Sequence, residues 1–185
     1  DATAGANVWY NVGGGTGDVQ PWALQGTIAG WAMQGAAHIN AASIETTQTY
    51  SYTSDGNSTS HANLASGRSN SSFGTGIAST THGYCMGGNN NVVNATMKQT
   101  DKFLLTSTVT AVDIGDLIEA GDRASSQTSE TKGFISGGST SGNINRIESI
   151  TYSSDTFTGR TNDLITARHG IVGQSSETHG YASCG

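Results

Sequence analysis

Apolar, β-branched and aromatic residues occur along this chain in short runs that end at turn-forming residues. In RIESITYSSD, at 146–155, isoleucine and tyrosine alternate with polar residues, and the run ends at Ser154-Asp155. Runs of this length and composition are typical of β-strands. Helical patterning is almost absent. The pattern therefore predicts an all-β protein.

A motif of a glycine, an aromatic residue, three further residues and a second glycine occurs four times. Its members are Gly30, Trp31 and Gly35; Gly83, Tyr84 and Gly88; Gly133, Phe134 and Gly138; and Gly180, Tyr181 and Gly185. The first glycines of successive copies are 53, 50 and 47 residues apart. A nearly constant step of this kind indicates a repeat protein.

The similarity between copies extends beyond the motif. TSETKGFISGG at 128–138 matches SSETHGYASCG at 175–185, and GDLI at 115–118 matches NDLI at 162–165. The stretch 113–123 could form a helical turn, but the equivalent residues include Gly67 and Thr161-Asn162. We therefore expect loop and strand edge there, within a unit of about fifty residues.

A unit of this size with several short strands fits one four-stranded blade of a β-propeller. The sequence then divides into an atypical N-terminal cap with the end of a first blade at 1–35 and repeats at 36–88, 89–138 and 139–185. The glycines would serve where a strand passes close to the central channel and where a tight turn needs a positive φ. The aromatic residue would fill the space between neighbouring blades.

Several stretches resemble the kelch-like repeats in structural proteins of cyanobacterial viruses, and the resemblance covers roughly 36–185. The matching stretches are IESIT at 147–151, NDL at 162–164, Ala167-Arg168 and SSETHGY at 175–181, together with the diglycine of the earlier copies. Copies depart from the pattern at Gln34, Cys184, Ala120-Gly121 and Ser66-Gly67.

The resemblance implies a kelch-like propeller in a virion protein of the tail, fibre or capsid exterior. Other virion subunits would be its partners, and a host-surface glycan would be a further one. The chain holds about three units and the end of a fourth, fewer than the four to eight blades of most propellers. We expect either a segment of a longer protein or blades completed by a second chain, with exposed strand edges that pair with other subunits.

Composition narrows the function. The formal net charge is −6 and only eight lysines and arginines are present, which argues against nucleic-acid binding. No segment is apolar enough to span a membrane.

Trp9, Trp22 and Trp31 could form a capping core or an exposed contact patch, and the core is favoured. Cys85 and Cys184 occupy different places in their repeats, which predicts two thiols rather than a disulfide.

No catalytic, cofactor-binding or metal-ligating set is predicted. The pairs Glu130 with Glu177 and His82 with His179 recur at equivalent positions, which favours roles in turns. The other histidines, His38, His61 and His169, lack metal-ligand spacing. An acidic group could in principle hold calcium, but a solvated loop is favoured; it comprises Asp113, Asp116, Glu119 and Asp122.

Nucleophile and phosphate motifs are also missing from the sequence. No serine lies in a Gly-x-Ser-x-Gly motif, and the glycine-rich stretch 13–17 lacks the lysine of a phosphate-binding loop. We therefore expect a non-enzymatic structural protein. The alternative is a secreted carbohydrate-binding or carbohydrate-active propeller, in which tryptophan and tyrosine rings stack on sugars.

Overall fold

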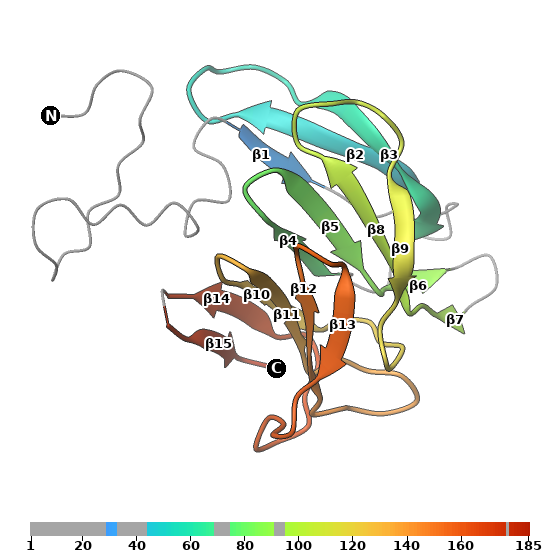
Figure 1. The fold of residues 1–185 in the computed structure, drawn as a ribbon, viewed down its shortest axis with the longest axis vertical. Coiled ribbons are helices and arrows are strands. Elements are labelled where there is room, and N and C mark those ends of the chain that lie inside the picture. The colour runs from blue at the N-terminus through green and yellow to red at the C-terminus, as the bar shows by residue number, and fades with distance from the viewer. Residues whose placement is uncertain (1–28, 33–43, 69–74, 91–94, 177) are drawn as a thin grey trace, which may run out of the picture.

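The computed structural model describes residues 29–32, 44–68, 75–90, 95–176 and 178–185 (Figure 1). Over these residues the chain forms β-strands, turns and loops, and it contains no helix. The prediction of an all-β protein is confirmed for this part of the chain. The stretch 113–123 forms the end of a strand followed by a loop, as expected.

Most strands belong to four antiparallel sheets that follow one another along the chain. The first sheet contains β1 (Ala29–Ala32), β2 (Ile44–Ser51) and β3 (Thr59–Arg68), and the second contains β4 (Thr75–Ala78), β5 (His82–Met86), β8 (Gln99–Leu104) and β9 (Val112–Asp116). The third contains β10 (Ser125–Thr128), β11 (Lys132–Ser136), β12 (Ile147–Thr151) and β13 (Thr156–Gly159), and the fourth contains β14 (Val172–Ser175) and β15 (Gly180–Ser183). A separate hairpin joins β6 (Asn89–Asn90) and β7 (Ala95–Thr96).

The repeated motif lies on the second strand of the last three sheets and on the first described strand of the first sheet. Its first glycine is on β5, β11 and β15, the second strand of the second, third and fourth sheets, and Gly30-Trp31 lies on β1. The second and third sheets each begin one strand before the motif, so they run across the boundaries drawn at 88/89 and 138/139. Gly35, Trp9, Trp22 and most of the expected cap lie outside the described residues.

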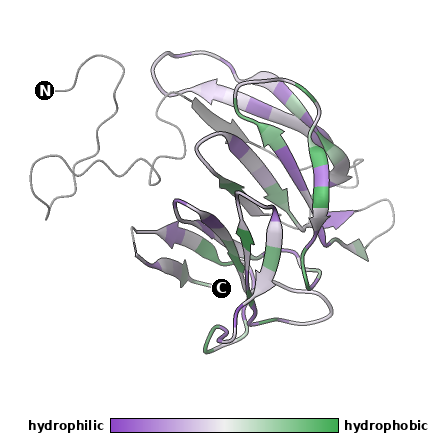
Figure 2. Cartoon of the chain, viewed as in Figure 1, coloured by the Kyte–Doolittle hydropathy of each residue, from purple (hydrophilic) through white to green (hydrophobic). Residues whose placement is uncertain are grey.

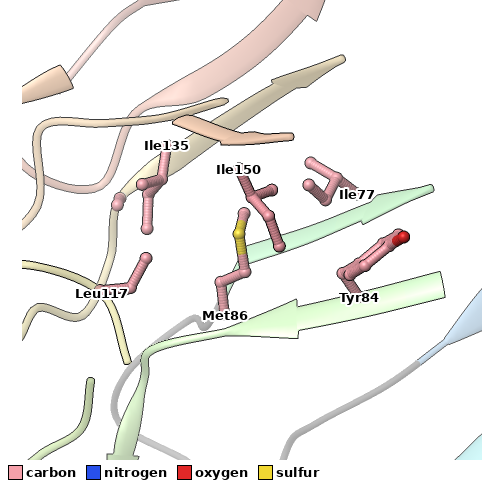
Figure 3. Packing of buried hydrophobic residues seen from close by; sticks show 7 residues of the cluster. Ile77, Tyr84, Met86, Leu117, Ile135 and Ile150 are labelled. Atoms are coloured by element: carbon pink, nitrogen blue, oxygen red, sulfur yellow. The ribbon is translucent and has the colours of Figure 1, made fainter. Parts of the chain in front are cut away.

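Apolar side chains lie mainly between sheets. Strand residues alternate between the two faces, so one strand can contribute side chains to the clusters on both sides of its sheet. Tyr84 and Met86 on β5 face the third sheet, whereas Cys85 between them belongs to a cluster against the first sheet. Figure 2 shows that the strands carry both hydrophilic and hydrophobic residues. The larger cluster contains Ile77, Tyr84, Met86, Leu117, Ala124, Ile135 and Ile150 (Figure 3). The smaller one contains Ala62, Leu64, Cys85, Phe103 and Ala111.

The first strands of three successive sheets lie side by side, since β10 contacts both β4 and β14. The Ser126 hydroxyl on β10 donates a hydrogen bond of 2.8 Å to the Gly76 carbonyl on β4. On the other side, a Cβ at Gly173 of β14 would overlap the Ser126 backbone, so this approach requires glycine. The described sheets do not close into a ring.

Candidate functional site

The contacts between neighbouring sheets are the repeated chemical feature of this structure. At Gly133 and Gly180 the first motif glycine makes one of them, because it accommodates a side chain from the preceding sheet. A Cβ at Gly133 would overlap the Cδ1 atom of Ile77 on β4. A Cβ at Gly180 would lie 3.1 Å from Cγ of Gln127, which occupies on β10 the place that Ile77 has on β4. Each glycine therefore permits a close approach of two sheets.

The glycine pairs that follow β5 and β11 adopt left-handed backbone conformations. Gly87 and Gly88 have φ angles of 60° and 103°, and Gly137 and Gly138 have 65° and 113°. In the last copy Cys184 stands at the first position and still has a φ of 67°. The backbone shape of the turn is therefore kept where the glycine is not, at a cost in strain for Cys184.

Tyr84 fills the space between the second and third sheets. Its ring stacks on Tyr152 with a centroid separation of 5.2 Å, and the Lys102 Nζ lies 5.6 Å from the ring centroid. Lys102 also donates hydrogen bonds of 3.0 and 2.9 Å to the two carboxylate oxygens of Asp155, in the turn between β12 and β13 of the third sheet. Burial lowers the pKa of Lys102, but Asp155 and Tyr84 together raise this pKa above its usual value.

A buried carboxylate on the third strand of the second sheet binds the first sheet. Asp101 on β8 accepts hydrogen bonds from the backbone amides of Ala65 and Ser66, at 3.0 and 3.4 Å. Arg68 at the end of β3 donates to the same carboxylate at 2.6 Å, and the two side chains are fully buried. Arg68 also donates to the carbonyls of Gly87 and Gln99. The pair is thus completely enclosed and well supplied with hydrogen bonds.

Glu148 on β12 has the equivalent role between the second and third sheets. The register places Asp101 opposite Cys85 and Glu148 opposite Ile135, which are equivalent residues of their sheets. Glu148 accepts from the amides of Ile118 and Glu119 at 2.8 and 3.0 Å. These two residues correspond to Ala65 and Ser66 in the preceding repeat.

The arginine of this second carboxylate site comes from the opposite sheet. Arg146, just before β12, lies 2.9 Å from Glu148, and it corresponds to Gln99 in the other repeat. The position equivalent to Arg68 is Gly121, where a Cβ would lie only 2.9 Å from Nη2 of Arg146. A guanidinium therefore accompanies each carboxylate, but it reaches the first site from the preceding sheet and the second from the carboxylate's own sheet.

A hollow of about 310 Å³ lies between the third sheet and β15. Its lining includes equivalents of five members of the cluster between the second and third sheets. Gln127, Phe134, Ser136, Leu164 and Ala182 correspond to Ile77, Tyr84, Met86, Leu117 and Ile135. No described residue takes the place that Ile150 has in that cluster. The hollow is therefore an intersheet space without a side chain from a third strand.

Arg168 has the place in its repeat that Arg68 has beside the first carboxylate site. Arg68 donates to the carbonyl of Gly87, and Arg168 donates to the carbonyl of Cys184, the equivalent residue, at 3.2 Å. The residues equivalent to Ala65 and Ser66 are Ile165 and Thr166, both exposed. Among the described residues β15 pairs only with β14, so no third strand presents a carboxylate here.

The recurring histidines lie in equivalent tight turns. A hydrogen bond of 2.8 Å joins Nδ1 of His82 and the hydroxyl of Thr81. The equivalent bond between Nδ1 of His179 and the hydroxyl of Thr178 is 2.7 Å long. Burial, followed by the charge of Lys102, lowers the pKa of His82. Glu130 is exposed, and Glu177 lies outside the described residues.

The other candidate residues do not converge on a common ligand position. Asp113 accepts from the amide of Gly115, Glu119 lies 3.8 Å from Arg146, and Asp122 pairs with Arg123. Within the described ranges no three histidine, cysteine or acidic residues are grouped as metal ligands. His38 lies outside the described residues, whereas His61 contacts the Leu104 carbonyl and His169 contacts Asn143.

Cys85 is buried and Cys184 is exposed, and no disulfide joins them. No helix that could cross a membrane is present in the described part of the chain.

Comparisons with known proteins bear on the fold alone. No protein-family model matches the chain, and no curated protein matches it. Among solved structures, the chain is similar to the one titled "Structure of YjhT", with 13% sequence identity and a TM-score of 0.51. The match covers 62% of this chain and 34% of the other, so the chain corresponds to about a third of that structure's length. The arrangement of successive antiparallel sheets is therefore one that a solved protein also adopts.

Proposed function

We propose that this chain is a non-enzymatic structural protein of a virus particle, in which kelch-like β-propeller blades form a rigid module for subunit assembly. The observation that carries the proposal is the repeated, buried joint between sheets, with Asp101 and Glu148 at equivalent positions. Such joints fix the position of each sheet relative to the next. A rigid surface of this kind suits a component that holds other subunits in place.

The viral setting rests on the resemblance of the repeats to those of cyanobacterial virus proteins. The net charge of −6 agrees with a role on the outside of a particle, where solubility is needed.

Localisation in particles tests this proposal. Antibodies raised against the 185-residue chain should label the tail, fibre or outer shell of cyanobacterial virus particles in immunogold electron microscopy. Peptides of the chain should also band with intact particles in a density gradient and remain there after washing with high salt. Recovery of the protein only in fractions without particles would overturn the viral role.

A carbohydrate-binding propeller is a second candidate, and the hollow beside β15 favours it. Phe134 and Tyr181 line this hollow, and the Arg160 guanidinium lies 5.6 Å from the Phe134 ring centroid. Aromatic faces with neighbouring polar groups can stack on sugar rings. Binding to a glycan array, lost in Phe134→Ala and kept in Phe157→Ala, would support this candidate. Release of reducing sugar by the purified chain would contradict the non-enzymatic proposal.

A further inference from the structure

We propose that Asp55-Gly56, in the turn between β2 and β3, is a site of spontaneous isoaspartate formation, and that its product is a substrate for a carboxyl methyltransferase that uses S-adenosylmethionine. The reaction begins when the backbone nitrogen of Gly56 attacks the side-chain carbon Cγ of Asp55. The inference goes beyond the proposed function, because it depends on the chemistry of one turn and not on assembly into a particle.

The sequence contains this dipeptide once. Asp55 is the one aspartate in the chain that is followed by a glycine, and no asparagine is followed by a glycine. A side chain on the following residue hinders the approach of its backbone nitrogen to the aspartate, whereas glycine has no Cβ and rotates freely. A Cβ added to Gly56 would have no atom within 4 Å, so the surrounding chain also leaves the turn open.

Hydrogen bonds hold the turn at its two ends. At its start, the Ser51 hydroxyl accepts hydrogen bonds of 3.0 and 3.1 Å from two backbone amides of the turn. At its end, Ser58 donates a hydrogen bond of 2.7 Å to Gln48 on β2. Within the described ranges no hydrogen bond engages the amide of Gly56. This nitrogen is therefore free to turn toward the Asp55 carboxyl group.

The equivalent turn of the third sheet provides an internal comparison. Asp155 corresponds to Asp55, but it precedes Thr156 and has a φ of 52°. Both of its carboxylate oxygens accept hydrogen bonds from Lys102 on β8. Residues 152–155 make this turn, whereas the longer stretch 52–58 joins β2 to β3. A carboxylate held by a lysine in a short turn is poorly placed to react with the next backbone nitrogen.

The solvent exposure of the turn is a property of its place in a sheet. The second sheet packs beside the turn of the third sheet, since Lys102 reaches Asp155 there. Even so, Ser153, Ser154 and Thr156 are exposed. Water therefore reaches a turn of this kind in a complete joint, and the reaction both releases and consumes water.

The atoms balance with water as the only reagent of the isomerisation. The Gly56 nitrogen forms a bond to Cγ of the protonated Asp55 carboxyl group, and one Cγ–O bond breaks as water leaves, which gives a cyclic succinimide. Water that adds at Cγ restores aspartate. Water that adds at the main-chain carbonyl carbon breaks its bond to the nitrogen, so the chain then runs through Cγ.

The isoaspartyl product carries a free α-carboxylate in an exposed turn. An oxygen of this carboxylate attacks the methyl group of S-adenosylmethionine, the bond between sulfur and methyl breaks, and S-adenosylhomocysteine leaves. The product is a methyl ester at the carboxylate that the isomerisation created. Ordinary aspartate has no α-carboxylate within a chain, so the methyltransferase distinguishes the two forms.

Incubation of the purified chain in warm buffer, followed by peptide mapping, tests the proposal. We expect the peptide with Asp55 to separate into two species of equal mass, of which an isoaspartyl methyltransferase labels one. Gly56→Ala should lose the labelled species and keep the fold, because the added Cβ meets no atom. Asp55→Asn should give the same isoaspartyl peptide faster, because ring closure then releases ammonia.

A second variant separates the effect of the turn from that of the dipeptide. Thr156→Gly creates an Asp-Gly pair in the turn that Lys102 holds, and we expect much less isoaspartate at position 155 than at Asp55 in the same sample. Equal amounts at the two positions would overturn the structural argument. Intact Asp55 after an incubation that converts a free peptide of residues 49–59 would overturn the site itself.

Discussion

At the scale of single residues, the motif glycines act by leaving space. The space where a Gly133 side chain would lie is filled by Ile77 of the preceding sheet. At Gly83 the same space is filled by the ring of Phe103 in its own sheet. The same sequence feature therefore serves two kinds of contact. In both cases the side chain that fills the space belongs to an intersheet cluster.

Adding one methyl group tests this use of glycine. Gly133→Ala should lower the free energy of unfolding by about 1–3 kcal/mol, because the new Cβ overlaps Ile77 in a packed interface. Gly56→Ala is the matched control, since no atom lies within 4 Å of its added Cβ, and we expect a change within about 0.5 kcal/mol. Urea unfolding of both variants measures the difference. Equal stabilities would show that the interface relaxes freely.

Tyr152 predicts a loss of stability in alkaline solution. Burial raises its pKa to about 12, although the hydrogen bond with Thr128 acts in the opposite direction. The unfolded chain should lose this proton near the ordinary tyrosine pKa of about 10, so the contribution of Tyr152 is complete below that pH and disappears as the pH rises toward 12. The unfolding free energy of the original chain should therefore fall over this interval.

Tyr152→Phe provides the comparison for this pH dependence. It lacks the titrating hydroxyl, so its unfolding free energy should fall less between pH 10 and 12 than that of the original chain. Denaturant titrations at several pH values give both slopes. Parallel curves would contradict a buried, neutral Tyr152.

At the scale of strands and sheets, the carboxylate joints hold neighbouring elements together. Asp101 binds both the backbone of β3 in the first sheet and the Arg68 side chain at the end of that strand. Removing one partner of such a buried pair leaves the other charge without compensation.

Asp101→Ala should therefore destabilise the protein by about 3–5 kcal/mol, because Arg68 remains fully buried without its carboxylate. Asp116→Ala removes an exposed carboxylate from the neighbouring strand β9, and we expect it to change stability by about 0.5 kcal/mol or less. Thermal and urea unfolding measure both. A small effect at Asp101 would mean that the joint is not important for holding the sheets together.

The arginine comes from the preceding sheet at Asp101 and from the carboxylate's own sheet at Glu148. We therefore expect that two substitutions beside Glu148 can compensate for each other. Arg146→Gln deprives Glu148 of its arginine, and Gly121→Arg alone drives a second guanidinium into Arg146. The two changes together recreate the Arg68–Gln99 arrangement. We expect each single variant to be less stable than the double variant, with a coupling of about 0.5–3 kcal/mol in a double-mutant cycle. Additive effects would show that the two joints are not equivalent.

These joints also show where sequence reasoning succeeded and where it did not. The all-β class and the intersheet place of Tyr84 follow from short apolar runs and from the physical limits on glycine and aromatic rings. The carboxylate sites were missed, because the residue is aspartate in one repeat and glutamate in the other. The arginine is Arg68 at the end of β3 in one case and Arg146 just before β12 in the other, so it does not recur at one position when the repeats are aligned. Only the strand pairing in the structure shows that Asp101 and Glu148 are at equivalent positions.

At the scale of the whole molecule, the sheets differ in how completely they are paired. The second and third sheets have four strands each, and apolar clusters cover them on facing sides. The fourth has two strands in the described residues, and Val172 and Tyr181 are exposed on it. Local stability should follow this difference.

Hydrogen exchange measured by mass spectrometry should therefore show a gradient. Amides of β14 and β15 should exchange faster than those of β5 and β11, which lie inside four-stranded sheets. Uniform protection along the chain would indicate that the fourth sheet unfolds only with the rest.

The position of Arg146 has a consequence for the order of the units. Deletion of the one unit between them would bring Arg68 face to face with Arg146 and leave two cations at Glu148. The units are therefore not interchangeable, although their sequences resemble one another, and a chain shortened by that unit should lose stability at this joint.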